Sequence, residues 1–565
     1  MILNRIKKIR ERFKDFDIDG YIIPKNDEFF SEYAENDRLK NISKFTGSAG
    51  LAIILKTKNY LFVDGRYTIQ AQNECGKNFK IIEIHKKLPH TIIKNCKLGF
   101  DPHLFTTNSL KRYFSNNNKL ISINENLIDK IYKSKKKKTK PFFSLPAKVA
   151  GQNHNSKIKK IINFLKFNKV DYLYVSAPEN VAWLLNIRGY DNPTSPIPNS
   201  RLIIGKNKKI LLITTINKTQ KIIKEKKIKK KEVFDYREFE ELVSRLKGTN
   251  FIIDNQTCSA FDEKIINSRF AINNQKDPIY KLKSIKNSSE ISHMIEAHKK
   301  DGLALTKFIY WIKNVNKKNI TEVDAQNKLE KFRKMNVSYL YPSFNTIAGT
   351  GSNGAIVHYR AAKFNTKQIN KNDIFLCDSG GQYKYGTTDV TRTICFSKPK
   401  QYIKNTFTKV LKGHIAVAIT NLNKDNTGKK IDLRARKFLK KDGLDYAHGT
   451  GHGVGFFLNV HEGPQSISKN NSIKFEEGMI LSNEPGFYKK NYFGIRIENL
   501  LYVKKKNNLL CFENLTLAPI EKDLINYSLL NKTEKDYLFK YHLSIYAEYS
   551  SFLNKKERKW LANLI

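Results

Sequence analysis

The segment IFLCDSGGQYKYGTTDVTRTICF, residues 374–396, gives the clearest indication of the fold. Two apolar runs flank a Gly-containing turn, a pattern that predicts an antiparallel hairpin. Asp378 ends the first run and Asp389 lies eleven residues further on, so the two carboxylates can face each other across the ladder. Two carboxylates held together without a cation repel each other. Taken alone, however, the pair is also compatible with ordinary aspartates at strand ends.

A Gly-rich segment later in the chain carries histidines. It reads HGTGHGVG over residues 448–455 and is followed by HEGP at residues 461–464. Glycine at every second position makes a helix improbable, so a loop or strand in close contact with another group is predicted. His448, His452 and His461 are three of the twelve histidines of the chain. Such clustering disfavours an incidental Gly-rich turn.

Two further segments, MILSNEPGFY (479–488) and FGIRIENLLYV (493–503), add acidic side chains to apolar strands. Glu484 ends the first strand just before a proline. In the second strand, Arg496 and Glu498 alternate with isoleucines. They should therefore share one face of a strand whose other face is core.

Together these segments supply four carboxylates and one imidazole, which are Asp378, Asp389, His452, Glu484 and Glu498. Four negative charges balance two divalent cations, and a mostly hard-oxygen ligand set favours Mn²⁺ over a zinc site built on thiolates. Two such ions about 4 Å apart hold a bridging hydroxide and polarise a carbonyl. The sequence therefore predicts metal-assisted hydrolysis.

The N-terminal half contains a repeated pattern. Apolar residues spaced alternately by four and three over residues 2–16 predict an amphipathic helix. A strand at 19–24, a long helical stretch and strands at 51–55 and 60–63 are expected to follow. The same order recurs 152 residues later, with a helix before the strand DYLYV (171–175). We expect two α/β units of one design, at 1–140 and 154–288.

The C-terminal half begins with a helix signal, because Asn287 and Glu290 form a plausible capping pair. Short strands, glycines and the acidic residues described above fill the region up to residue 505. The aromatic segment DYLFKYHLSIYAEYSSFL (536–553) then predicts a helical extension that serves in packing.

The composition is that of a globular chain of several domains, with 565 residues of which 40% are hydrophobic and 27% charged. Six cysteines without close pairs argue against a disulfide framework or a zinc ribbon. The charged N-terminus lacks the apolar stretch of a secretory signal, and no run of 18 apolar residues occurs. We therefore expect a soluble, cytoplasmic protein without membrane partners.

The net charge of +49, from 102 Lys and Arg against 53 Asp and Glu, raises the possibility of nucleic-acid binding. The dense runs, however, are only two. Lys133–Lys140 is predicted to be an interdomain linker, and Lys218–Lys231 a solvated helix or loop. Lysine is abundant elsewhere too. We expect incidental solvated charge, and no specific nucleic-acid partner.

These motifs resemble the aminopeptidase P family (Xaa-Pro aminopeptidases), which has the pita-bread metallopeptidase fold. The resemblance is carried by TIAGTGSNGAIVHY, DSGGQYKYGTTDVTRT, HGTGHGVGFFLNVHEGP, SNEPGFY and FGIRIENL. It extends over the whole chain and is strongest to the long, three-domain cytosolic form. It implies an α/β (α+β) fold with two creatinase-like N-terminal domains (1–140 and 154–288), a pita-bread catalytic domain (289–505) and a short helical extension (506–565).

The resemblance also implies roles for individual residues. Asp389 and Glu498 would bridge two divalent metal ions, Asp378 would serve one ion, and His452 and Glu484 the other. Glu484 would also shuttle the proton of a metal-bridging hydroxide. The residues assigned to catalysis are Glu484, His358, His448, His461 and Arg496, and those assigned to substrate binding are His358, His448, His461 and Tyr488.

The implied reaction is release of the first residue of a peptide with proline in second position, by a homodimeric enzyme with two Mn²⁺ ions. The peptide bond to proline has no N–H group, so a protease that binds its substrate as a β-strand cannot hydrogen-bond to it there. An exopeptidase with a pocket for the proline ring suits such a substrate. The alternatives are a prolidase that cleaves only dipeptides and a non-enzymatic peptide-binding module. Creatinase uses the same fold without metals, and the complete ligand set argues against it.

Two local features depart from simple expectation. Tyr385-Gly386 stands where the long forms usually carry Asp-Gly, so we expect altered turn geometry with intact metal binding. Gly349-x-Gly351-x-x-Gly354 formally matches a dinucleotide fingerprint. It leads into AIVHY, which is predicted as a strand, whereas the fingerprint requires a helix there.

Overall fold

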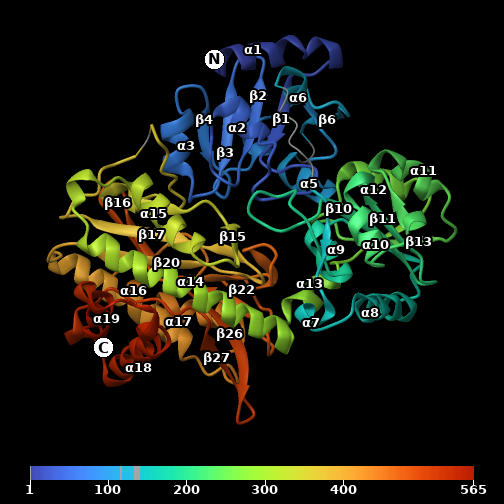
Figure 1. The fold of residues 1–565 in the computed structure, drawn as a ribbon. Helices are drawn as coiled ribbons and strands as arrows, with labels where there is room; N and C mark the ends of the chain where they lie inside the picture. Colours follow the sequence, from blue (N-terminus) through green and yellow to red (C-terminus); the bar gives the residue numbers. More distant parts are fainter. Residues whose placement is uncertain (1, 115–116, 133–139, 365) are drawn as a thin grey trace. The chain divides into compact units, whose positions relative to one another are not determined.

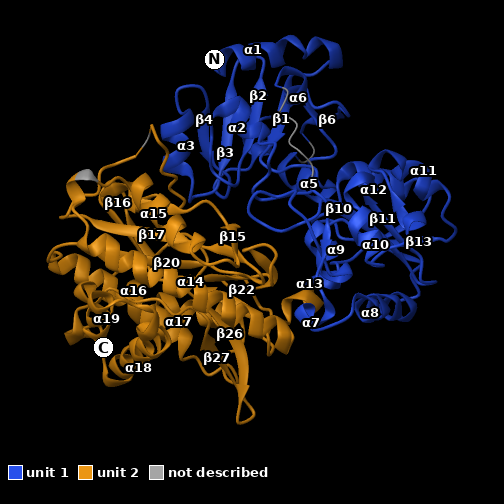
Figure 2. Cartoon of the chain, in the orientation of Figure 1, with its two compact units in different colours: residues 1–280 blue, residues 281–565 orange. Residues whose placement is uncertain are grey.

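The computed structural model describes residues 2–114, 117–132, 140–364 and 366–565. The chain divides into two compact units, residues 1–280 and 281–565 (Figure 2). The predicted linker at Lys133–Lys140 falls almost entirely outside the described residues.

Unit 1 contains two six-stranded sheets of the same topology (Figure 1). The first has the order β4-β3-β2-β1-β5-β6 and the second β12-β11-β10-β8-β13-β14. The strands of the first are β1 (Gly20–Pro24), β2 (Leu51–Leu55), β3 (Asn59–Val63), β4 (Lys80–Glu83), β5 (Lys97–Phe100) and β6 (Lys119–Ser122). Those of the second are β8 (Tyr172–Val175), β10 (Ser200–Gly205), β11 (Ile210–Thr214), β12 (Val233–Phe234), β13 (Asn250–Ile253) and β14 (Ala271–Asn274). β2 in the first sheet and β10 in the second run antiparallel to both of their neighbours, and all other neighbouring strands are parallel. The repeat seen in the sequence is therefore a repeat of topology.

The helices that precede the two sheets form as predicted. In α1 (Ile2–Glu11) the isoleucines of one face are buried. In α8 (His154–Phe167) Asn153 caps the first turn, and the buried face includes Ile161 and Leu165. Burial of such apolar stripes supplies most of the stability of a surface helix.

The long helix expected between residues 25 and 50 was a wrong prediction. Only α2 (Arg38–Ser43) forms there. The carboxylate of Asp27 accepts hydrogen bonds from the backbone N–H groups of Phe29 and Ser31, at 3.0 and 2.9 Å. Such local side-chain bonds favour turns over helix, which explains the difference.

Unit 1 also buries a charged pair. Arg201 Nη1 lies 3.0 Å from Asp262 Oδ2, and both side chains are almost fully buried. The hydroxyls of Tyr174 and Tyr236 donate to the same carboxylate at 2.9 and 2.6 Å. Asp262 is therefore fully compensated by one cation and two donors.

Unit 2 combines long helices with short strands (Figure 1). Its helices are α14 (Ser288–Asn314), α15 (Glu322–Lys334), α16 (Gln401–Ala418), α17 (Gly428–Lys440), α18 (Lys532–Tyr549) and α19 (Lys555–Ala562). The predicted capping box of Asn287 and Glu290 starts α14. The extension predicted to be helical forms α18 and buries Leu538, Tyr541 and Ile545.

Four groups of strands form the sheets of unit 2, with orders β16-β17-β20, β15-β18-β19, β22-β21-β23-β26-β27 and β24-β25. Their bounds are β15 (Tyr339–Pro342), β16 (Ile347–Thr350), β17 (Ile374–Ser379), β18 (Gly381–Tyr383), β19 (Gly386–Thr387), β20 (Val390–Cys395), β21 (Gly451–Gly453), β22 (Glu462–Ile467), β23 (Ile480–Asn483), β24 (Gly486–Lys489), β25 (Phe493–Arg496), β26 (Asn499–Lys506) and β27 (Leu509–Asn514).

The predicted hairpin at 374–396 is present as the antiparallel pair β17–β20, with Asp378 opposite Thr391. Its connection is more elaborate than one tight turn, because β18 and β19 form a second, inner hairpin that pairs with β15. At the tip of that inner hairpin, the ring of Tyr385 packs edge-on against His293 and Phe457.

Two strand predictions in unit 2 need correction. Residues 351–355 form a 3-10 helix and AIVHY is not a strand, although no α-helix begins there either. Gly351, at φ 53°, turns the chain, and Asn353 donates to the buried Glu322 at 3.0 Å. The segment 493–503 is two strands, β25 and β26, and both Arg496 and Glu498 are buried, so neither face of it is open to solvent.

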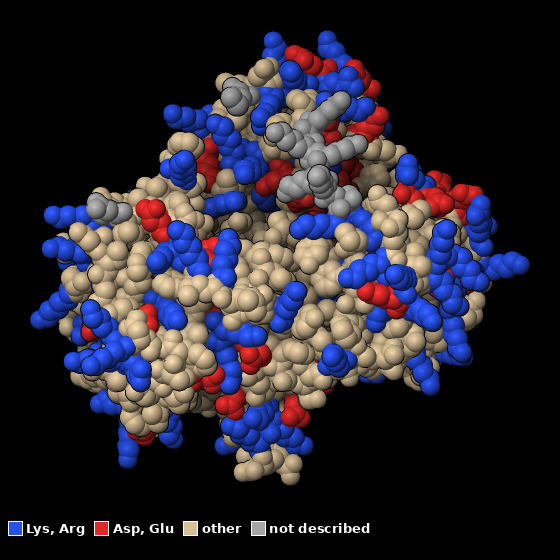
Figure 3. Space-filling view, in the orientation of Figure 1, with Lys and Arg blue, Asp and Glu red and all other residues tan. Residues whose placement is uncertain are grey.

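Three global features complete the description. All six cysteines, each within the described residues, are free thiols. Among the described residues, no helix combines the length and apolar character needed to cross a membrane. On the face drawn in Figure 3, Lys and Arg are spread over both units with uncharged and acidic side chains between them. That spread is typical of solvated charge.

Candidate metal centre

The five predicted ligands are placed by strand ends and strand edges of unit 2. Asp378 lies near the end of β17, Asp389 directly before β20, and His452 in the middle of β21. Glu484 follows β23 directly, and Glu498 lies between β25 and β26. Asp378, Glu484 and Glu498 follow apolar stretches that bury their strands, whereas Asp389 follows Gly-Thr-Thr and His452 follows Gly-Thr-Gly.

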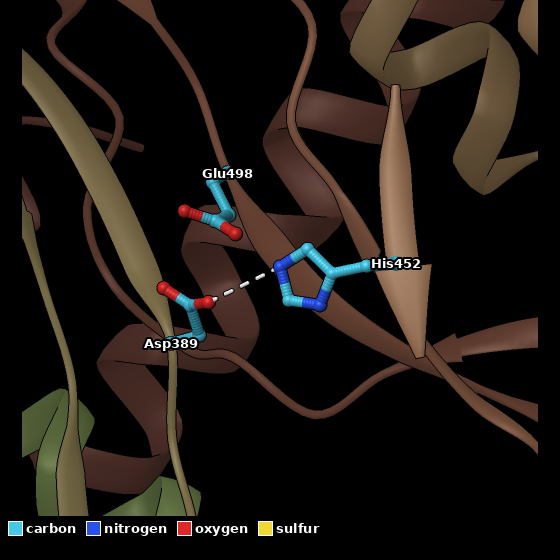
Figure 4. Close-up of side chains that lie close together, drawn as sticks. All are labelled: Asp389, His452 and Glu498. Carbon is cyan, nitrogen blue, oxygen red and sulfur yellow. Dashed lines mark ion pairs between the residues drawn. The ribbon is translucent and has the colours of Figure 1, made fainter. Parts of the chain in front are cut away.

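Asp389, His452 and Glu498 point toward one another (Figure 4). One ligand atom from each of the three lies within 4.8 Å of the other two. His452 Nε2 is 3.4 Å from Asp389 Oδ2 and equally 3.4 Å from Glu484 Oε1. Three of the acids predicted from the sequence thus surround one imidazole nitrogen.

Asp378 joins the group through Arg496. The guanidinium of Arg496, which is buried, donates from Nη2 to Asp378 Oδ2 at 2.5 Å. Burial together with the nearby Asp389 raises the pKa of Asp378 to about 6, although Arg496 acts in the opposite direction. The structure therefore brings all five predicted ligands into one neighbourhood.

The electrostatics show an excess of negative charge. Burial, and then the charges of neighbouring carboxylates, raise the pKa of Glu498 well above its usual range. Burial likewise raises the pKa of Glu484. Burial disfavours charge on His452, yet the adjacent Asp389 and Glu484 raise its pKa to about 9. Such shifts are those of acids that need additional positive charge nearby.

The donor set fits divalent cations. Asp378 Oδ1 and Asp389 Oδ1 are buried and have no hydrogen-bond donor among the described residues. The ring of His452 is oriented by Nδ1, which donates to the carbonyl of Gly453 at 2.9 Å, and this directs Nε2 toward the carboxylates. Carboxylate oxygens with one imidazole suit hard or borderline divalent ions.

A chain of hydrogen bonds leads from Asp378 to a predicted substrate residue. Arg496 Nη1 donates to the hydroxyl of Tyr488 at 2.6 Å, and that hydroxyl lies 2.8 Å from His448 Nε2. Arg496, Tyr488 and His448 therefore form one hydrogen-bonded chain that ends on Asp378.

The remaining two predicted histidines lie at the edge of the group. The ring of the exposed His461 is 4.3 Å from that of His452, at an angle of 82°. His358 is half-buried. Its neighbour Val357 accepts from Arg496 Nη2 at 3.4 Å, which places the segment of His358 beside the same guanidinium.

Sequence reasoning missed two hydroxyls that fix the acids. Thr391 Oγ1 donates to Glu498 Oε2 at 2.7 Å. Ser482 Oγ donates to Glu484 Oε1 at 3.0 Å and accepts from the backbone N–H of His452 at 2.9 Å. Each hydroxyl lies two positions from a candidate ligand, Thr391 after Asp389 and Ser482 before Glu484, so the strand period of two would have indicated both.

Comparisons with known proteins identify the family of the chain. Residues 292–505 match metallopeptidase family M24, and 508–564 match the C-terminal region of peptidase M24. Residues 5–131 and 133–290 each match a creatinase/prolidase N-terminal domain. A probable Xaa-Pro aminopeptidase P of Laccaria bicolor is 36% identical over 99% of this chain and 92% of its own length. The chain belongs to the Xaa-Pro aminopeptidase P family.

Other relatives point the same way. Xaa-Pro aminopeptidase 1 of Dictyostelium discoideum is 34% identical over 100% of this chain and 96% of its own. The crystal structure of X-prolyl aminopeptidase from Caenorhabditis elegans, described as a cytosolic enzyme with a di-nuclear active site, superposes with a TM-score of 0.91 at 29% identity, covering 100% and 99% of the two chains. Membership of the aminopeptidase P family makes the chain a metallo-aminopeptidase and confirms the predicted fold class, including the creatinase-like domains.

Proposed function

We propose that this chain hydrolyses the first peptide bond of substrates that carry proline in second position, releasing the N-terminal residue. The observation that supports this most is the convergence of Asp378, Asp389, His452, Glu484 and Glu498 in a chain related over its full length to Xaa-Pro aminopeptidases. Arg496, Tyr488 and the three histidines beside these acids provide the surroundings that a peptide would contact.

The residues that would hold two divalent ions are the four acids and the histidine of the centre, with Asp389 and Glu498 shared by both. We propose Mn²⁺ as the ion because the ligands are mostly hard oxygens. When bound, the ions supply Lewis acidity and lower the pKa of water. The raised pKa values of Asp378 and Glu498 mean that protons compete with cations for the site.

Glu484 is the proposed proton carrier. Its Oε1 accepts a hydrogen bond from Ser482 Oγ, and burial raises its pKa, which suits a group that takes up and returns a proton. It accepts a proton from the attacking water. It then returns that proton to the proline nitrogen as the peptide bond breaks, so no charge accumulates on the leaving group.

The histidines hold the substrate. His461, exposed next to His452, can donate to the scissile carbonyl oxygen as negative charge develops on it. His448 is oriented by its bond to Tyr488, and the segment of His358 lies beside the guanidinium of Arg496, so both histidines are proposed to contact the peptide. These groups together bind the proline and the carbonyl, while Arg496 positions Asp378 and Tyr488.

The competing function is that of a prolidase. A prolidase from Pyrococcus horikoshii OT3 superposes with a TM-score of 0.52 at 25% identity, and covers 65% of this chain. Relatives that match the chain over its full length are named Xaa-Pro aminopeptidases, and this favours the aminopeptidase over a dipeptidase. Peptide length therefore separates the two functions.

The deciding experiment compares Arg-Pro-Pro with Gly-Pro as substrates, after chelation and after addition of Mn²⁺. We expect release of arginine from Arg-Pro-Pro only in the presence of the ion. Cleavage of Gly-Pro alone would identify a prolidase, and cleavage of neither peptide would contradict the proposed function.

Three further features belong to this proposal. The chain would act in the cytoplasm as a homodimer, which sedimentation equilibrium would detect. Its parts would be those expected from the sequence, 1–140, 154–288, 289–505 and 506–565. The positions of the family matches support this division.

A further inference from the structure

Unit 2 contains a buried charged cluster that the proposed chemistry does not use. It consists of Lys283, Lys286 and Glu462, and we call it the Glu462 cluster. The ammonium group of Lys286 forms an ion pair with Glu462 Oε1, and Lys283 Nζ lies 3.3 Å from Glu462 Oε2. All three side chains are at most 2% exposed.

The Glu462 cluster lies directly beside the candidate centre in the chain. Glu462 follows His461, and in the β21–β22 pair it stands opposite Gly453, the residue after His452. Its carboxylate reaches back under the connecting loop, because a Cβ atom added to Gly455 would come within 3.0 Å of Glu462 Oε2. The side chain of Glu462 thus supports the loop that joins His452 to His461.

The same loop has a second buried anchor before His461. The side chain of Gln382, which is buried, donates from Nε2 to the carbonyl of Leu458 at 2.9 Å. The backbone of Gly455 donates to Asn459 at 3.0 Å. The ring of the exposed His461 packs against that of His452, and the segment that carries it is fixed by the anchors that flank it.

The lysines are held firmly by the strand that leads to Glu484. The backbone N–H of Lys286 donates to Gly478 at 3.0 Å, and Ile285 forms a β-bridge with Met479, just before β23. Lys286 Nζ also donates to the carbonyl of Ser284 at 3.2 Å. The cations therefore stand on a backbone that is fixed relative to the candidate centre.

A buried ion pair gains little net stability, because desolvation of the charges offsets their attraction. A cluster of two buried lysines around one glutamate is therefore better explained by what it positions than by stability. We propose that Lys283, Lys286 and Glu462 are positioning residues that hold His461 at the candidate centre. The effect that we expect on catalysis rests on the proposed function.

The test compares Lys286→Met with Lys281→Met. Lys281 belongs to the same segment but pairs with Glu476 on the surface, where both side chains are largely exposed. Lys286→Met leaves Glu462 paired with Lys283, so the fold should persist. We expect kcat on Arg-Pro-Pro to fall about 10-fold, because a misplaced group lowers the rate. KM should stay within about twofold of the parent value, and the metal content should be unchanged. Lys281→Met should match the parent, and Lys286→Arg should recover most of the rate.

A double variant distinguishes positioning from general damage. If Lys286 acts through His461, then His461→Ala combined with Lys286→Met should be no slower than His461→Ala alone, because effects that share one group do not add. Multiplication of the two losses would overturn the proposal. So would an equal loss of rate in Lys283→Met, Lys286→Met and Lys281→Met.

A readout without substrate separates this inference from the proposed function. In protein with labelled histidine rings, the resonance of His461, assigned by its loss in His461→Ala, should shift or broaden in Lys286→Met and stay unchanged in Lys281→Met. An unchanged His461 resonance in Lys286→Met would overturn the positioning role even if the parent cleaves Arg-Pro-Pro. A shift in an enzyme that cleaves no Xaa-Pro peptide would retain the positioning role and contradict the function alone.

Discussion

Asp262 in unit 1 and Glu498 in unit 2 are both buried carboxylates, yet their surroundings are opposite. Asp262 has Arg201 and two tyrosine hydroxyls as partners. Glu498 has one threonine hydroxyl and lies among other acids, which together with burial raise its pKa well above its usual range. The first arrangement is complete without any ligand, whereas the second is complete only with added positive charge.

The difference shows how to separate structural from functional burial of charge. A carboxylate whose charge is balanced by the protein needs no ligand, and it holds the structure around it in place. A group of carboxylates that the protein leaves unbalanced costs stability, and is retained because it binds something. Substitutions in the two regions should therefore have opposite consequences for stability and for activity.

The largest effect is expected at Glu484. Glu484→Ala should lower kcat on Arg-Pro-Pro by about 10²–10⁴-fold, because it removes the proton carrier. Asp389→Ala should lose activity together with bound metal, since Asp389 is proposed to serve both ions. Steady-state rates and elemental analysis of each purified variant check this. Near-normal rates in either variant would refute the site assignment.

The second effect belongs to the balanced carboxylate. Asp262→Asn leaves Arg201 buried without its counter-charge and should lower the free energy of unfolding by about 3–5 kcal/mol. Metal content and kcat of the folded variant should stay near those of the parent. Urea unfolding measures the loss, with the exposed Glu240→Gln as a neutral control. If the two variants unfold alike, Arg201–Asp262 is not a structural pair.

The third effect has the opposite sign. In metal-free protein, Glu498→Gln should raise stability by about 0.5–2 kcal/mol, because it removes a group whose charge is disfavoured by burial and by the neighbouring carboxylates. The same variant should no longer be stabilised when Mn²⁺ is added. Thermal unfolding with and without the ion tests both statements. A destabilised metal-free variant would show that the acids do not repel one another.

The fourth effect is a dependence of stability on pH, caused by two histidines whose pKa values are shifted in opposite directions. Burial, with nearby lysines, lowers the pKa of His154 in unit 1 to about 4. The unfolded chain therefore takes up this proton first as pH falls below about 6.5, and stability declines between pH 6.5 and 4. The raised pKa of His452, about 9, makes metal-free protein lose stability as pH rises from about 6.5 to 9.

Thermal unfolding midpoints of chelated protein across this range test the pH dependence. His154→Gln should flatten the acid side and His452→Gln the alkaline side. His85→Gln, at an exposed position, should change neither. Parallel curves for all three variants would contradict both assignments.

Much of the site follows from local pattern. Asp378 and Glu484 end apolar runs, and the glycines around His452 exclude a helix, so their elements were predictable from the sequence. The roles of Thr391 and Ser482 could have been inferred from the strand period of two, because each lies two positions from a candidate ligand. Nothing in the chemistry of these hydroxyls, however, distinguishes them from other hydroxyls in the sequence.

Pairs brought together only by the tertiary fold could not be predicted. Arg201 and Asp262 are 61 residues apart, and Lys286 and Glu462 are 176 residues apart. No local propensity connects such positions. The helix predicted before β2 does not form for a different reason. The carboxylate of Asp27 accepts hydrogen bonds from nearby backbone N–H groups, and hydrophobic periodicity does not detect such competition with helical hydrogen bonds.

The free thiols have a practical consequence for work on this enzyme. Cys75, Cys258, Cys377 and Cys395 are buried, and burial raises the pKa of each, which protects them from alkylation. Cys96 and Cys511 are partly accessible and lie one in each unit. A donor and an acceptor dye attached to these two native sulfurs would follow, by energy transfer, any change in the separation of the units while a peptide is being cut.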